Sequence, residues 1–260
     1  MINSTPLEYL LKRDRSIIIT GLVLITILSW LYIIYLYRQM VVMDMSAVFF
    51  AMPMTQHWTI TDFALLFVMW LVMMIAMMTP SVSPLILIFA MVSRKKRQQQ
   101  DPFVHTGYLL AGYFLVWGGF SLPATLLQWL LQQVSLLNPE MKTTSKILGS
   151  IILIAAGIFQ FTALKKTCLG NCRTPIDFIH RNWKEGKLGA LKMGIENGMY
   201  CLGCCWVLMV LLFFSGVMNL LWIALITVFV LIEKTFPQPK WISSVAGIAL
   251  IAYGFIVLIH

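Results

Sequence analysis

Long apolar runs separated by short polar segments dominate the pattern of residues along this chain. A helix needs about 20 apolar residues to cross the hydrocarbon of a bilayer. The runs of about this length cover residues 17–37, 60–91, 104–133, 146–165, 194–215, 217–233 and 241–259. The pattern predicts an all-α, polytopic transmembrane helix bundle of about seven spans, with residues 1–260 forming a single transmembrane domain.

Two of these runs have unusual boundaries. Pro80 and Pro84 interrupt the long second run, and the hydroxyl residues around them can bond carbonyls that a proline leaves free, which predicts a kinked or broken helix. The fifth and sixth runs are separated only at Ser215 and Gly216, which predicts a tight hairpin. Six spans remain the alternative if this hairpin or the first run is misassigned.

Composition supports a membrane protein. Apolar residues make up 60% of the chain and charged residues only 11%, whereas a soluble domain carries about 25% charged residues. The first run is too long for a signal-peptide core and is expected to anchor the chain. The net charge of +9 comes from residues in short segments between apolar runs, where they face lipid headgroups, so nucleic-acid binding is not expected.

The distribution of basic residues predicts the orientation. If the N-terminus is inside, the inner segments hold 16 of the 19 Lys and Arg residues and the outer segments hold three. The positive-inside rule therefore predicts a cytoplasmic N-terminus and, for seven spans, an outer C-terminus. Asp62 and Glu233 lie near span ends and are expected to meet the interface.

The fifth run carries the densest group of potential metal ligands. Cys201, Cys204 and Cys205 have the spacing i, i+3 and i+4, so Cys201 faces both of the others on a helix. Disulfides within one helical turn are geometrically poor and are disfavoured in the cytoplasm. Metal ligation and packing as small apolar side chains remain the two interpretations. Glu196 is expected either to complement the helix dipole or to act as a ligand or proton acceptor.

Methionines and a second cysteine pair extend this inventory. In the second run, one i, i+4 row holds Met69, Met73 and Met77, and its neighbour holds Met74 and Met78. These methionines pack a core in the simplest interpretation, but thioethers together with thiolates select Cu(I) over harder ions. Cys168 and Cys172 share a helical face and suit either a two-thiolate site or a structural role. The outer segment offers a further group that is either an interfacial segment or a transient copper station: Met45, Met52, Met54 and His57.

Three strings carry a resemblance to a known family. They are WLVMMIAMMTPSVSP at 70–84, LKKTCLGNCRTPIDF at 164–178 and GMYCLGCC at 198–205. Over residues 60–259 the chain resembles a family of bacterial integral membrane proteins described as metal-binding, formerly a domain of unknown function. The resemblance implies a multi-pass protein of the bacterial inner membrane that supplies copper to oxidases such as tyrosinases and laccases. The positions that match the family pattern imply a ligand set of Met73, Met77, Met78, Cys168, Cys172, Cys201, Cys204 and Cys205; Asn171 stands where members often have His.

These observations predict a copper(I)-handling membrane protein that is not an enzyme. Cys168 and Cys172 are expected to receive Cu(I) at the cytoplasmic face, and the thiols of the fifth run to hold it within the membrane. The expected partners are the lipid bilayer and an extracytoplasmic cuproenzyme or copper carrier. Glycines 107, 112, 118 and 119 predict close helix packing, within one chain or in a homo-oligomer. The alternatives are a transporter of a non-metal substrate, a structural subunit of a membrane complex, or a thiol–disulfide relay.

Overall fold

The structure, a computed structural model, describes residues 6–42, 59–98, 106–137, 141–236 and 239–259. Its regular elements within these ranges are helices, which confirms the all-α prediction. In chain order they are α1 (Pro6–Val42), α2 (Ile60–Gln98), α3 (Thr106–Gln133), α4 (Lys146–Phe159), α5 (Ala163–Arg173), α6 (Pro175–Asn182), α7 (Gly186–Ser215), α8 (Leu220–Thr235) and α9 (Pro239–Ile259).

Five helices of the described ranges are long and apolar enough to cross a membrane: α1, α2, α3, α7 and α9. The expected run 146–165 is not one straight helix, because the chain bends by 61° between α4 and α5, and this pair counts as a sixth span if it is taken as one. The side chain of Thr162 accepts a hydrogen bond from the backbone N–H of Lys165 and so caps α5 at the bend. The long apolar helices mark the chain as a membrane protein.

The expected reversal after the fifth run is a short turn at residues 216–219. Gly216 has a φ of 97°, a conformation that glycine adopts without strain. The side chain of Asn219 then accepts a hydrogen bond from the backbone N–H of Trp222 and caps α8. Helix α8 has 16 residues, which is shorter than a typical membrane span.

Helix α2 continues without a break through Pro80 and Pro84. The hydroxyl of Ser83 donates to the carbonyl of Pro80 at 2.7 Å. This carbonyl would otherwise accept from residue 84, which is proline and has no N–H. The prediction that hydroxyls compensate for the prolines is therefore confirmed at this position, and of the two predicted forms, kinked or broken, the broken one is absent.

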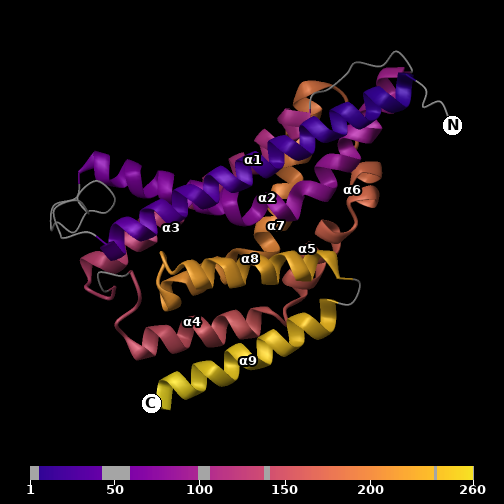
Figure 1. Cartoon of the computed structure of the whole chain (residues 1–260). Coiled ribbons are helices and arrows are strands. Elements are labelled where there is room, and N and C mark those ends of the chain that lie inside the picture. The colour runs from indigo at the N-terminus through magenta and orange to yellow at the C-terminus, as the bar shows by residue number, and fades with distance from the viewer. Residues whose placement is uncertain (1–5, 43–58, 99–105, 138–140, 237–238, 260) are drawn as a thin grey trace.

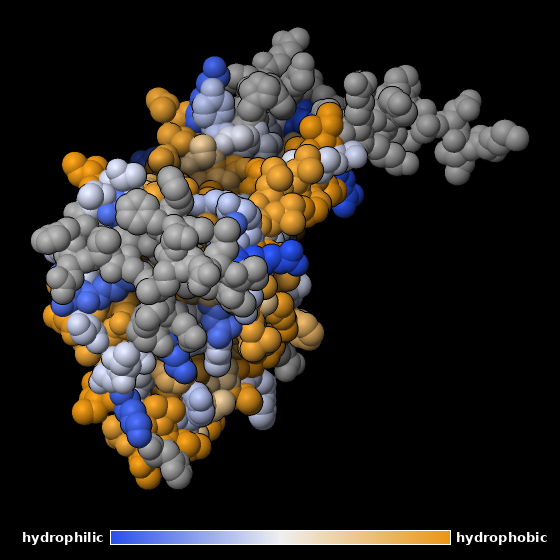
Figure 2. Space-filling model, turned by 60° about the vertical axis from the view of Figure 1, so that its left-hand side comes forward, coloured by the Kyte–Doolittle hydropathy of each residue, from blue (hydrophilic) through white to orange (hydrophobic). Residues whose placement is uncertain are grey.

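Helix α7 lies at the centre of the bundle. In the most apolar 18-residue stretch of α7, 67% of the residues are buried. The corresponding share is only 17% in α1 and in α9. Figure 1 shows α1, α2 and α3 on one side, α4 and α9 side by side on the other, and α7 crossing from one group towards the other. Apolar side chains cover much of the surface in Figure 2, as expected of helices that face lipid.

Helices α3 and α7 cross at two glycines with their backbones in contact. A Cβ atom at Gly112 would lie 2.2 Å from the carbonyl oxygen of Leu191, and one at Gly194 would lie 2.1 Å from that of Leu109. The prediction of close packing is thus correct for Gly112. At Gly107 and Gly119 a Cβ would meet nothing within 4 Å, so these two glycines do not serve close packing within the described part of this chain.

A buried ion pair ties α5 to α8. The ammonium of Lys165 donates to both carboxylate oxygens of Glu233, at 2.7 and 2.8 Å. Ser243 of α9 donates to the same carboxylate at 2.6 Å, and Gln160 accepts from Lys165. Glu233 is only 2% exposed, so its expected place at the interface is wrong. Donors from two neighbouring helices, α5 and α9, satisfy a carboxylate that the sequence places near a span end.

Candidate metal centre

The thiols of α7 lie in the interior, close to one carbonyl. Cys201, Cys204 and Cys205 are each at most 2% exposed. The thiols of Cys204 and Cys205 both donate to the carbonyl oxygen of Cys201, at 3.1 and 2.7 Å. The helical spacing thus gathers the three residues within about one turn, as the sequence predicts.

Helix α5 brings the second cysteine pair to the same place. The side chains of Cys172 and Cys204 lie close enough to interact. Cys168 packs against Gly203 of α7, where a Cβ atom would lie only 2.7 Å from its sulfur. The sequence predicts two separate thiol sites, one at the cytoplasmic face and one within the membrane. In the structure they are neighbours where α5 contacts α7. All five cysteines are free thiols, and we call them the thiol cluster.

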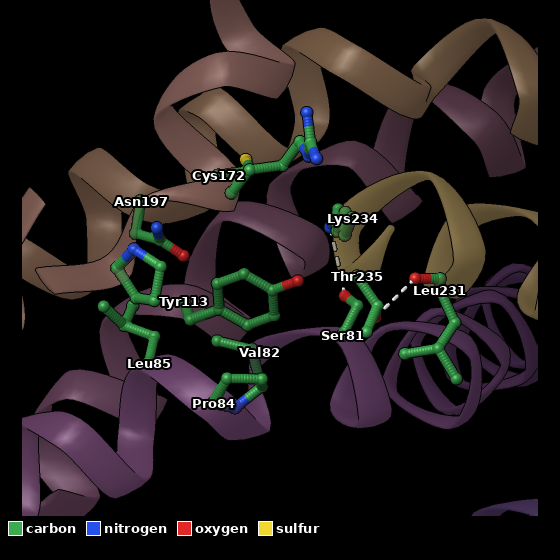
Figure 3. Close-up of a pocket in the computed structure, with 12 residues that line it drawn as sticks. Ser81, Val82, Pro84, Leu85, Tyr113, Cys172, Asn197, Leu231, Lys234 and Thr235 are labelled. Carbon is green, nitrogen blue, oxygen red and sulfur yellow. Dashed lines mark hydrogen bonds between the residues drawn. The ribbon is translucent and has the colours of Figure 1, made fainter. Parts of the chain in front are cut away.

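Three further residues lie at the thiol cluster, two of them in contact with the sulfur of Cys201, and sequence reasoning missed them. The ammonium of Lys234 donates to the sulfur of Cys201 at 2.9 Å and to the hydroxyl of Ser81 at 3.0 Å. The hydroxyl of Tyr113 lies 2.9 Å from the same sulfur. In Figure 3 the Tyr113 hydroxyl points towards Ser81 and Lys234. The cluster therefore combines soft sulfur ligands with one cation and two hydroxyls.

A cavity of about 210 Å³ adjoins this cluster. Cys172, Lys234, Tyr113, Asn197 and Ser81 all line it. Figure 3 shows these side chains arranged around one space, although they come from α2, α3, α5, α7 and α8. Such a space gives a small cargo room to approach Cys172.

The methionines lie on the helix that supplies Ser81. Met73, Met77 and Met78 are each at most 1% exposed. The Ser81 hydroxyl donates to the carbonyl of Met78 at 2.9 Å. Met77 and Met78 therefore lie within about one helical turn of a residue that contacts Lys234, and Met73 lies about one turn further along α2.

The comparison with known proteins adds the family. Residues 67–257 match the family described as PpoB2, copper chaperone, and this stretch contains the thiol cluster and Lys234. The chain belongs to this copper chaperone family. Copper binding is the property that the family name indicates, and the name is that of a chaperone and not of an enzyme. Searches among curated proteins and among solved structures gave no match.

The structure pairs Glu196 with Lys184 in a partly exposed ion pair. Since α7 begins at Gly186, Glu196 lies about three turns inside the helix and not in its first turn. The expected interaction with the helix dipole is therefore wrong. The partner of this carboxylate is Lys184, two residues before the start of α7.

The part of the chain that the structure describes contains no group of three or more His, Cys, Asp or Glu side chains placed to hold a metal ion together. A closed four-ligand zinc site is therefore not preformed in these residues. Two soft ligands can be sufficient for Cu(I), and the Cys172–Cys204 contact provides such a pair. Met45, Met52, Met54 and His57 lie outside the described residues.

Proposed function

We propose that this protein is a membrane-bound Cu(I) chaperone that passes copper to an extracytoplasmic cuproenzyme or copper carrier. In this proposal its seven apolar runs lie in the bacterial inner membrane, with the N-terminus inside and the C-terminus outside. The observation that carries the proposal is the meeting of Cys172 of α5 with Cys204 of α7, beside Cys201 and Cys205.

Thiolates are the ligands that favour Cu(I). Binding requires the deprotonated sulfur, and soft sulfur ligands distinguish Cu(I) from harder ions. The pair Cys172 and Cys204 joins two helices, so Cu(I) held between them links α5 to α7. Cys201 and Cys205 then offer alternative sulfur atoms within one turn, and Met77 with Met73 and Met78 offers thioethers nearby. Exchange among closely spaced soft ligands lets a chaperone hold copper and still release it.

Lys234 suits this chemistry through its charge. A Cu(I) ion between two thiolates forms a complex with a net charge of −1, and an unbalanced charge in a protein interior is costly. The ammonium of Lys234 lies 2.9 Å from Cys201, where its positive charge offsets the complex. The cavity beside the thiol cluster supplies the approach for the cargo, and the outer methionines would be the next station towards a partner.

The metal content of the purified protein tests the site. The protein in detergent is kept anaerobic and reduced, loaded with Cu(I) and washed with a Cu(I) chelator before elemental analysis. We expect wild type to retain about one copper per chain and the double variant C172S/C204S to lose it. The control is Met199→Ser, which also places a serine on α7 but changes a side chain that is 56% exposed and outside the cluster.

A second pair of variants separates ligation from packing. Met77→Leu conserves volume at a buried position, while Met91→Leu makes the same change on α2 where the side chain is 56% exposed. Such swaps usually cost less than about 1.5 kcal/mol of stability. If Met77 contributes a thioether, M77L retains less copper under chelator and M91L does not.

Full copper retention in C172S/C204S would reject the thiol site.

The contact between Cys172 and Cys204 also suits a thiol–disulfide relay. The relay needs these two thiols to oxidise to a disulfide, whereas copper transfer needs them reduced. Trapping a mixed disulfide between this chain and a partner in cells would favour the relay, and copper retention by the reduced protein favours the chaperone.

A further inference from the structure

A second, larger cavity lies against α5. Its volume is about 480 Å³, which falls in the usual range of small-ligand sites. Five of its lining residues lie on α5, and one of them, Arg173, also lines the smaller cavity beside Cys172: Lys165, Lys166, Leu169, Gly170 and Arg173. Gln160, Ser243 and Ser244 complete the lining, which includes no cysteine.

The charge around this cavity is positive. Three of its lining residues are basic, and none is acidic: Lys165, Lys166 and Arg173. Only Lys165 is neutralised by a carboxylate, that of Glu233 behind it. Lys166 is exposed at the rim. The cavity therefore presents an excess of cations to whatever enters it.

Two buried donors at this cavity have no partner. The amide oxygen of Gln160 accepts from Lys165, but its Nε2 has no hydrogen-bond partner although the residue is only 2% exposed. The guanidinium of Arg173 donates to the carbonyl of Phe236, but its buried Nε also has no partner. A buried donor without an acceptor is costly. Both groups are donors, so the missing ligand is an acceptor.

The neighbourhood of the cavity suits a lipid headgroup. Trp241 is 74% exposed in the first turn of α9, and Leu164 and Val245 beside the lining residues are more than half exposed. Tryptophan is enriched at the level of the headgroups. Basic pockets between transmembrane helices on the cytoplasmic side bind anionic headgroups.

We propose that this cavity binds a phosphate-bearing anion, with the phosphate accepting hydrogen bonds from Gln160 and Arg173 and facing Lys166. The inference does not depend on the copper site, because no cysteine lines this cavity and neither Gln160 nor Lys166 lines the smaller one. An anionic membrane lipid and free phosphate share this chemistry. The position of Trp241 favours the lipid as the source.

The decisive variant is Gln160→Glu. It keeps an oxygen that accepts from Lys165 but replaces the unpartnered donor by an anionic acceptor, which repels phosphate. Lys166→Gln removes a cation from the exposed rim and is expected to leave the fold intact. The matched control is Lys192→Gln, which makes the same change at an exposed position on α7 outside the cavity.

Native mass spectrometry of the full-length protein in detergent measures retained lipid after addition of phosphatidylglycerol or phosphatidylcholine. We expect selective retention of phosphatidylglycerol by wild type and K192Q, weakened about tenfold in Q160E and K166Q, as for loss of one charge-assisted hydrogen bond. Calorimetric titration with inorganic phosphate is the second arm. Phosphate binding without lipid retention would assign the site to a soluble anion.

Two outcomes would overturn the proposal. One is equal retention of the two lipids by wild type, with no binding of phosphate. The other is unchanged binding in K166Q, together with unchanged binding in Q160E if that variant folds. Copper content measured on the same samples keeps the two sites apart, since C172S/C204S is expected to lose copper and still bind the anion.

Discussion

The ammonium group of Lys234 joins the thiol cluster to α2. It contacts the sulfur of Cys201 and the hydroxyl of Ser81, and it lines the smaller cavity. A cation in this position favours negatively charged sulfur and a negatively charged copper complex. Its removal therefore changes the charge of the site without removing a ligand.

We expect Lys234→Met to weaken Cu(I) binding by about tenfold or more, because a hydrogen bond to a charged group contributes about 1.5–3 kcal/mol. Lys234→Arg keeps the charge and is expected to retain most of the affinity. Competition with a calibrated Cu(I) chelator gives the dissociation constants. Lys192→Met is the control, and equal affinities in wild type and K234M would contradict the role of the charge.

The sequence shows why Lys234 is missed. As a basic residue at the end of an apolar run, it fits the positive-inside pattern and needs no other explanation. Only the packing of α8 against α2 and α7 places it at a thiol. Tyr113 and Ser81 are missed for the same reason, since a tyrosine in α3 and a serine after a proline carry no pattern that connects them to Cys201.

At the scale of elements, the crossing of α3 and α7 sets the distance between Tyr113 and Cys201. Gly112 precedes Tyr113 and touches the backbone of α7, so the two helices approach as closely as backbones can. Interfaces between membrane helices commonly use small residues in this way.

We expect Gly112→Ala to destabilise the protein by about 1–3 kcal/mol, because the added methyl meets backbone atoms that cannot rotate away. The move of Tyr113 away from Cys201 should also change the reactivity of the thiol with alkylating reagents. Gly107→Ala is the matched control on the same helix, where a Cβ meets nothing within 4 Å. Similar thermal unfolding of the two variants would contradict the close crossing.

The ion pair of Lys165 and Glu233 gives a second prediction for the contact between elements. Breaking a buried pair by removing one partner costs about 3–5 kcal/mol, because the other charge is left buried alone. We expect Lys165→Met to show such a loss and the double variant K165M/E233L to recover much of it. Unfolding in a denaturant series measures this, and additive losses would show that the two groups act separately.

Apolar periodicity and length predict the helices of this chain well, because each expected run coincides with a helical stretch. They do not predict the bend at Thr162, where a hydroxyl cap and two lysines end an apolar segment. The contact between α5 and α7 also cannot be predicted from the sequence. Helical spacing shows which cysteines share a face within one helix, but it does not relate one helix to another. Which faces meet depends on tertiary packing.

At the scale of the whole molecule, the number of spans determines where the C-terminus lies. An odd number of crossings with the N-terminus inside places His260 outside, and six crossings place it inside. We expect a C-terminal alkaline phosphatase fusion to be active and a C-terminal green fluorescent protein fusion to be dark. The opposite pair of results would favour six spans, with α4–α5 or α8 failing to cross.

The adjacent charges Glu233 and Lys234 at the end of α8 have a consequence for biosynthesis. An unpaired charged side chain costs about 2.5–3.5 kcal/mol at the centre of a membrane helix, and less towards its ends. The partners of these two residues, Lys165 on α5 and Cys201 on α7, leave the ribosome before α8 does. When α8 is inserted, the partners of both charged side chains have therefore already been synthesised. Glu233 and Lys234 can then pair as the helix packs, so neither charge has to enter the membrane unpaired.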